Sequence, residues 1–185
     1  MNKKIIKIDI DGVLRDMLSE MCYIYNREYN ESIKPSDVKE YDVDKTFTKC
    51  NEIDGMSAKY FFFNDYAYEL CSFPKVIDKA KEALDLLHKL NYYIIIVSYQ
   101  NDYINKEATL SWLNEHNIYY DSICFTDRKD LIHGDIIVDD NPEFLNICDD
   151  NEEKILIDAP YNKNENRYKR FNSLYDYVLS IDNKK

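Results

Sequence analysis

The sequence has no hydrophobic run that approaches the roughly 20 consecutive apolar residues of a membrane-spanning helix, although 45% of its 185 residues are hydrophobic. Its first residues, "MNKKIIKIDI", are basic and then apolar, but Lys7, Asp9 and Asp11 interrupt that run too early for a signal peptide. With 32% charged residues, the composition is that of a soluble globular protein. We therefore expect a cytoplasmic protein with no membrane partner.

Closely spaced cysteine and histidine ligands are also missing. The five cysteines are scattered without a C-x-x-C pair, so we expect no structural zinc site. An odd number of scattered cysteines favours reduced thiols in an intracellular protein. We expect no catalytic role for the three histidines, His88, His116 and His133.

Basic residues are in the minority: 24 Lys and Arg stand against 35 Asp and Glu, which gives a formal net charge of −11. A field of that sign repels polyanions, so we expect neither a nucleic acid polymer nor an anionic membrane as partner. A small phosphorylated substrate remains compatible with it if a local cation offsets the charge. The sequence leaves a homodimer possible.

Short β-branched runs alternate with helical patterns along most of the chain. The predicted strands are residues 4–9, 92–98, 135–140 and 154–158, with a weaker candidate at 120–125. Helical patterns cover 76–90, 107–116, 142–148 and 173–181, and the polar stretch 161–170 reads as a surface loop. This alternation predicts an α/β fold with a doubly wound, Rossmann-like parallel sheet.

Residues 18–73 break that alternation. A helical stretch at 18–30 is followed by a polar break around Pro35 and an aromatic cluster, "YFFFNDYAY", at 60–68, with no strong strand pattern. We predict a small helical cap at 18–73, inserted after the first strand, and a core domain made of residues 1–17 and 74–185.

Polar side chains cluster where the predicted strands end. In open α/β sheets ligands bind beyond the carboxyl ends of the strands, and the residues expected at that edge are Asp9, Asp11, Ser98, Lys129, Asp139 and Asp140. Crowded carboxylates need a cation, and oxygen ligands without histidine favour Mg²⁺.

These residue types suit phosphoryl transfer. An aspartate can form an aspartyl-phosphate, a role that fits Asp9, and Asp11 is placed to supply the proton that the leaving oxygen needs. Lys129 would offset the charge of the transferring phosphoryl group, and Ser98 would hydrogen-bond a phosphate oxygen.

Each residue also has an ordinary structural alternative. The two aspartate pairs could cap helices or form turns, and Ser98 could bond only locally at its strand end. Lys129 competes with Arg128 for the site role, and either of them could be a solvated surface charge. The aromatic cluster could form the core of the cap rather than a surface on which a base stacks.

Four motifs together resemble those of the haloacid-dehalogenase-type phosphatases. "DIDGVLRD" is similar to their first motif, and "IIIVSYQ" to the second, a strand that ends in Ser or Thr. Lys129 stands at the position of the third-motif lysine, and "DIIVDDNPE" resembles the acidic fourth motif. The runs "KEATLSWLNEH" and "FTDRKDLIHGDIIVDDNPE" resemble, more narrowly, the 5'(3')-deoxyribonucleotidase branch.

The resemblance implies a role for each matching residue. Asp9 would be the nucleophile and Asp11 the general acid and base. Mg²⁺ would be held by Asp9, the backbone carbonyl of Asp11, and Asp140, with Asp139 in support. Phosphate would be bound by Ser98, Tyr99 and Lys129, and the substrate candidates are Met17, Phe61, Phe62 and Lys106.

The sequence departs from this pattern at three places. Ser98-Tyr99-Gln100 replaces the usual Thr-Ser-Pro, Met17 stands where an aromatic residue is common, and Pro74-Lys75 replaces Pro-Gly. These changes leave the expected reaction intact and bear on the substrate.

The expected function is a Mg²⁺-dependent phosphomonoesterase acting on nucleoside monophosphates, deoxy forms included. The alternatives are a phosphatase for another small metabolite, such as a sugar phosphate, and a nucleotide-binding protein without turnover. Dehalogenase or phosphomutase activity fits the residues less well.

Overall fold

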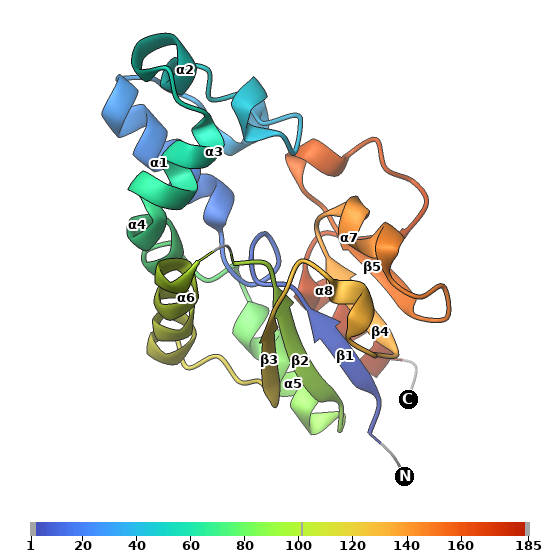
Figure 1. Ribbon diagram of the computed structural model, residues 1–185. Coiled ribbons are helices and arrows are strands. Elements are labelled where there is room, and N and C mark those ends of the chain that lie inside the picture. The colour runs from blue at the N-terminus through green and yellow to red at the C-terminus, as the bar shows by residue number, and fades with distance from the viewer. Residues whose placement is uncertain (1–2, 101, 184–185) are drawn as a thin grey trace.

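The computed structural model describes residues 3–100 and 102–183, and a six-stranded parallel sheet forms its centre (Figure 1). The strand order is β3-β2-β1-β4-β5-β6. The strands are β1 (Ile5–Ile8), β2 (Tyr93–Ser98), β3 (Ser122–Phe125), β4 (Ile136–Asp139), β5 (Glu153–Ile157) and β6 (Lys169–Phe171). The doubly wound α/β prediction is thereby confirmed, and so are the five predicted strands.

Helices cover both faces of the sheet because side chains alternate along each strand. Ile6 and Ile8 pack in one apolar cluster with residues of α5 (Ala80–Lys89), α6 (Tyr103–Glu115) and α8 (Leu174–Asp182). On the opposite face, Ile137 and Leu156 pack against α7 (Pro142–Ile147).

The strand β6 corrects the end of the surface loop predicted at 161–170, since it begins at Lys169. It pairs in parallel with β5 at the edge of the sheet, with Ile157 opposite Phe171. Its first residue, Lys169, is exposed, and Arg170 is half-buried. Because an edge strand tolerates charged side chains, it carries little of the apolar pattern on which the prediction relied.

Two helices begin at points that differ from the predicted ones. The helix α5 begins at Ala80 rather than at 76, because Lys79 takes a left-handed backbone conformation with φ 58°. The helix α6 begins at Tyr103 rather than at 107, because the Asp102 side chain caps it by accepting a bond from the Asn105 N–H.

Residues 18–73, together with Met17 at the start of α1, form the helical segment. It lies beyond the carboxyl end of β1 (Figure 1). This stretch is described throughout and contains no strand. It packs around its own apolar cluster, which includes Tyr25, Phe47, Phe62 and Leu70. Its elements are α1 (Met17–Tyr29), η1 (Pro35–Asp37), η2 (Val43–Lys45), α2 (Lys49–Asp54), α3 (Ala58–Tyr60), the π-helical turn η3 (Phe61–Asp65) and α4 (Ala67–Ser72).

The two chain connections into the helical segment run side by side. The Asp16 N–H donates to the Lys75 carbonyl at 2.9 Å, and the Ile77 N–H donates to the Leu14 carbonyl at 2.8 Å. The indole of Trp112 on α6 donates to the Pro74 carbonyl at 2.7 Å. These bonds tie both connections to one another and to the sheet layer.

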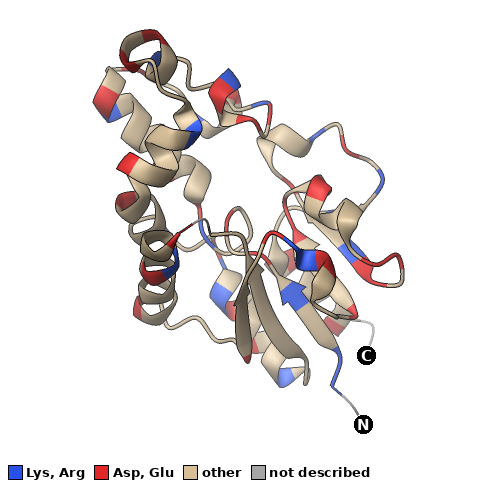
Figure 2. Ribbon diagram, viewed as in Figure 1, with Lys and Arg blue, Asp and Glu red and all other residues tan. Residues whose placement is uncertain are grey.

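Charged residues of both signs and free cysteines occur both in the sheet layer and in the helical segment (Figure 2). Acidic and basic residues are interspersed over the sheet layer and the helical segment (Figure 2). Within residues 3–100 and 102–183, which contain all five cysteines, no disulfide forms. None of the helices described is long and apolar enough to cross a membrane.

Lys7 is a fully buried lysine in the middle of β1. Its ammonium pairs with the buried carboxylate of Glu152 at 2.8 Å and donates to the carbonyls of Lys129, at 3.1 Å, and Ile132, at 2.8 Å. These bonds hold the turn η4 (Lys129–Leu131), which follows β3. A charge inside the sheet layer therefore fixes the backbone from which Lys129 reaches the edge of the sheet.

We expect the Lys7→Met substitution to lower the free energy of unfolding by roughly 3–5 kcal/mol, because it leaves the Glu152 carboxylate buried without its partner. Urea denaturation followed by circular dichroism measures the change. Lys45→Met, which removes an exposed pair with Glu40, is the control and should leave stability unchanged. A Lys7→Met protein as stable as the wild type would show that the buried pair contributes nothing.

Candidate active site

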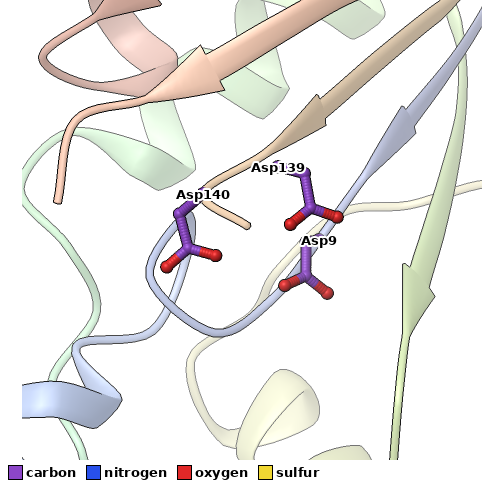
Figure 3. A group of neighbouring side chains, drawn as sticks. All are labelled: Asp9, Asp139 and Asp140. Carbon is purple, nitrogen blue, oxygen red and sulfur yellow. The ribbon is translucent and has the colours of Figure 1, made fainter. Parts of the chain in front are cut away.

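Three aspartates meet at the carboxyl edge of the sheet (Figure 3). Asp9 follows β1, Asp139 ends β4, and Asp140 comes next in the chain. All three are buried, and each offers a carboxylate oxygen within 4.8 Å of the others. The edge of the sheet thus concentrates three negative charges where ligands bind in folds of this kind.

Lys129 supplies a cation to two of these carboxylates. Its ammonium lies 2.9 Å from Asp9 Oδ1 and 2.7 Å from Asp139 Oδ2, and its side chain is 1% exposed. It also lies over the ring of Phe144 on α7, 4.4 Å from the centroid. Burial opposes the charge of Lys129, but Asp139 and Asp9 outweigh it and raise the pKa of this lysine. The surface-charge alternative for Lys129 is therefore wrong.

Gly12 lets the chain turn back beside Asp140. Its φ of 79° is in the left-handed region, and its N–H donates to the Arg15 carbonyl at 2.9 Å. A Cβ atom at this position would lie 1.7 Å from Asp140 Oδ2. Only glycine therefore allows the turn after β1 to pack directly against the carboxylate of β4.

The pKa values in the cluster reflect burial and repulsion. Burial raises the pKa of Asp9 to about 7, with Lys129 opposing this shift and Asp139 and Asp11 adding to it. Burial and the charges of Asp139 and Asp9 also raise the pKa of Asp140 well above its usual value. The folded protein therefore keeps these carboxyl groups close together against a tendency to take up protons.

The donor set fits a hard divalent cation. It consists only of carboxylate oxygens, and Lys129 pairs with Asp9 and Asp139 but, among the described residues, forms no ion pair with Asp140. Asp140 instead accepts a hydrogen bond from the Tyr161 hydroxyl. A cation beside Asp9 and Asp140 would balance the charge that Lys129 leaves uncompensated.

Asp11 points both carboxylate oxygens at hydrogen-bond donors. Arg15 Nε donates to Oδ1 at 2.7 Å, and Gln100 Nε2 donates to Oδ2 at 3.1 Å. The same Gln100 nitrogen lies 3.2 Å from the hydroxyl of Ser98 at the end of β2. Asp11 is thereby connected to Ser98 through one amide group.

A cavity of about 440 Å³ opens between these residues and the helical segment. Its floor includes Asp9, Asp11, Ser98, Lys129 and Asp140, which the sequence places together correctly at one edge. The opposite side includes residues of the helical segment, among them Met17, Met21, Tyr41, Lys59 and Phe63. The volume is in the usual range for small-molecule sites.

The remaining predicted site residues lie in different places. Met17 and Tyr99 line the cavity. Phe61 and Phe62 are buried in the apolar cluster of the helical segment, where their rings pack edge to face, and Lys106 on α6 is not among the lining residues described. Within the aromatic cluster at 60–68, the residue that lines the cavity is Phe63.

The alternative role of Asp139 and Asp140 as caps of the following helix is wrong, because another residue caps α7. The side chain that caps α7 is Asn141, which accepts from the Glu143 N–H at 2.9 Å. Asp139 accepts from the Asn141 N–H at 2.9 Å in addition to pairing with Lys129. Asp140 therefore does not cap α7, and its carboxylate lies beside that of Asp9.

Sequence reasoning missed four residues that contact the site: Arg15, Gln100, Phe144 and Tyr161. Arg15 could have been noticed as the one basic residue of the motif "DIDGVLRD", and Gln100 belongs to the stretch Ser98-Tyr99-Gln100 that departs from the usual pattern. Phe144 and Tyr161 carry no such signal, because they reach the site through the α7 helix and the turn η5 (Pro160–Asn162). Tyr161 also lies edge to face with Tyr41 of the helical segment, at 5.5 Å between centroids.

Comparison with known proteins agrees with this geometry. The chain is 33% identical to a 5'(3')-deoxyribonucleotidase of Clostridium acetobutylicum, over 95% of this chain and 93% of the relative. It is 29% identical to the enzyme of the same name from Bacillus subtilis, over 91% and 92%.

The fold is similar to that of a HAD-superfamily hydrolase from Ehrlichia chaffeensis. The two structures superpose with a TM-score of 0.56 over 99% of this chain and 98% of the other, at 15% sequence identity. The model of one family, described as 5' nucleotidase, deoxy (pyrimidine), cytosolic type C protein, matches residues 3–184. The chain therefore belongs to this nucleotidase family.

Proposed function

We propose that this protein is a Mg²⁺-dependent phosphomonoesterase that hydrolyses nucleoside monophosphates, deoxy forms included, through an aspartyl-phosphate on Asp9. The observation that carries the proposal is the position of the Asp9 carboxylate on the cavity floor, 2.9 Å from Lys129 and beside Asp140. Asp9, the Asp11 carbonyl and Asp140 would hold Mg²⁺, with Asp139 in support. The bound ion would neutralise charge on the phosphoryl group.

In the first step a carboxylate oxygen of Asp9 attacks phosphorus. The bond from phosphorus to the ester oxygen breaks, its electron pair stays on that oxygen, and the Asp11 carboxyl group donates a proton to it. Lys129 offsets the negative charge of the transferring group, and Ser98 donates a hydrogen bond to a phosphate oxygen. The nucleoside then leaves as a neutral alcohol.

In the second step water attacks the phosphorus of the aspartyl-phosphate and gives a proton to the Asp11 carboxylate. The bond from phosphorus to the Asp9 oxygen breaks, and inorganic phosphate and the free Asp9 carboxylate result. Asp11 recovers the proton that it gave away, so the cycle closes without another acid or base.

The helical segment, with the boundaries 18–73, would act as a cap over the substrate and exclude water from the first step. The cavity beneath it is bounded by apolar groups such as Met17, Met21 and Phe63 and by the exposed ring of Tyr99. These groups suit the flat face of a nucleobase. The second candidate, a sugar phosphate, is favoured by the polar groups Glu40, Asp42 and Lys59 on the same wall.

Phosphate release from a panel of 5' and 3' nucleotides, ribo and deoxy, and of sugar phosphates tests the substrate class. We expect the deoxyribonucleoside monophosphates to give the highest kcat/KM. Equal activity across the panel would contradict the nucleotidase proposal and leave the phosphatase reaction standing. Highest activity on sugar phosphates would favour the second candidate.

Asp9→Asn should lower kcat for p-nitrophenyl phosphate by at least roughly a thousandfold, because an amide cannot form the covalent intermediate. Circular dichroism should show an unchanged fold. Asp85→Asn, an equivalent change on the exposed face of α5, is the matched control and should keep full activity. Wild-type turnover by Asp9→Asn would rule out Asp9 as the nucleophile.

Removal of Mg²⁺ with a chelator should abolish turnover, and its return should raise the unfolding temperature, since the ion relieves repulsion that the folded state carries. Asp140→Asn should weaken Mg²⁺ binding by roughly tenfold or more, measured by isothermal titration calorimetry. The proposed ligand set is wrong if Asp140→Asn binds the ion as tightly as the wild type does.

A further inference from the structure

We propose that Arg15 and Gln100 are positioning residues that hold the Asp11 carboxyl group in the one orientation from which it protonates the leaving oxygen of an alkyl phosphate. This inference rests on the proposed function, in which Asp11 is the general acid. It assigns a role to a buried cation and a buried amide that the reaction steps above do not use.

Arg15 holds one oxygen of Asp11 from a rigid position. Its side chain is fully buried, and besides Asp11 Oδ1 it donates from Nη1 to the Cys71 carbonyl at 2.6 Å and to Thr109 Oγ1 at 3.1 Å. Its guanidinium also lies 5.4 Å from the ring centroid of Trp112. Three acceptors from three parts of the chain leave the guanidinium no freedom to swing.

Arg15 stays positively charged at this buried position. Burial disfavours the charge, but the carboxylate of Asp11 outweighs burial, so the pKa of Arg15 lies above its usual value. The backbone of Arg15 is equally fixed: its N–H donates to the Ile10 carbonyl, and its carbonyl accepts from Gly12, each at 2.9 Å. The donor to Asp11 Oδ1 thus belongs to the same tight turn as Asp11 itself.

Gln100 holds the other oxygen and sets the direction of the carboxyl plane. It is 5% exposed, and its Nε2 donates to Asp11 Oδ2 at 3.1 Å. Its Oε1 lies 3.8 Å from the sulfur of Cys71, which also lies 3.6 Å from Asn105 Oδ1. Because Nε2 of Gln100 also lies 3.2 Å from Ser98 Oγ, Asp11 Oδ2 is the oxygen on the side of the phosphate-binding groups. Each oxygen still has a free lone pair for a proton.

The effect on the rate of holding Asp11 between Arg15 and Gln100 depends on the leaving group. A nucleoside or sugar oxygen must be protonated as it departs, so a misdirected acid slows its loss, whereas p-nitrophenolate is a stable anion that leaves without a proton. A residue that merely stabilises the fold would affect both substrates alike. The ratio of activities on the two substrates therefore separates positioning of the acid from a structural role.

The experiment measures kcat/KM for p-nitrophenyl phosphate and for the best alkyl phosphate of the substrate panel. This parameter covers the steps up to departure of the leaving group, so the hydrolysis of the intermediate, common to both substrates, does not enter. We expect Gln100→Met and Arg15→Met to lower kcat/KM for the alkyl phosphate at least roughly tenfold more than for p-nitrophenyl phosphate. If Arg15→Met does not fold, Gln100→Met decides alone.

Two further variants make the result interpretable. Thr109→Val removes one acceptor of Arg15 and leaves its bond to Asp11 in place, so we expect a selective loss on the alkyl phosphate that is smaller than in Arg15→Met. Asp11→Asn should show the largest selective loss on the alkyl phosphate; equal losses would overturn the acid role of Asp11 and the inference with it. A selective loss in Asp11→Asn but equal losses in the Gln100 and Arg15 variants would overturn the inference alone.

Discussion

Repulsion among Asp9, Asp139 and Asp140 is the constraint on which the arrangement of this protein depends. Three buried carboxylates within 4.8 Å cannot stay ionised without positive charge nearby. The sheet brings them together because β1 and β4 are parallel neighbours, with Ile8 opposite Val138. Lys129 meets part of this requirement, and a divalent cation would meet the remainder.

The sheet layer below the site has to hold Lys129 in place while Asp9 and Asp139 attract its ammonium group. The turn η4 has little apolar packing of its own, since Leu131 is 64% exposed. Its backbone is secured instead by Lys7, whose ammonium reaches the carbonyls of Lys129 and Ile132. Two buried lysines thus act in sequence: one fixes the turn, and the other, projecting from that turn, pairs with Asp9 and Asp139.

The sequence predicted the sheet and the residues that meet at its carboxyl edge because both depend on strong local patterns. Four strands are β-branched apolar runs, a fifth is weaker, and Asp9, Ser98 and Asp139 come where three of the strong runs end. The edge strand β6 was missed because its charged residues carry no such pattern. The contacts of Gln100 and Tyr161 were missed for another reason: each joins segments distant in the chain, as when Tyr161 reaches Asp140 from the turn after β5. Arg15 lies only four residues from Asp11, but acceptors on distant segments, the Cys71 carbonyl and Thr109, hold its side chain there.

The sheet edge and the helical segment differ in how their residues are held in place. This difference explains why the sequence predicts the reaction more directly than the substrate. Residues of the sheet edge are fixed by ladder hydrogen bonds and by ion pairs, so their identity and their geometry are linked. The wall formed by the helical segment is built from short helices, where Phe62 is buried and the neighbouring Phe63 lines the cavity. A one-residue shift in the π-helical turn η3 would bring Phe62 to the place of Phe63, because adjacent residues on a helix face different directions. In the proposed function, substrate choice would therefore depend on the packing of this segment, and the chemistry on residues at strand ends that the sequence marks directly.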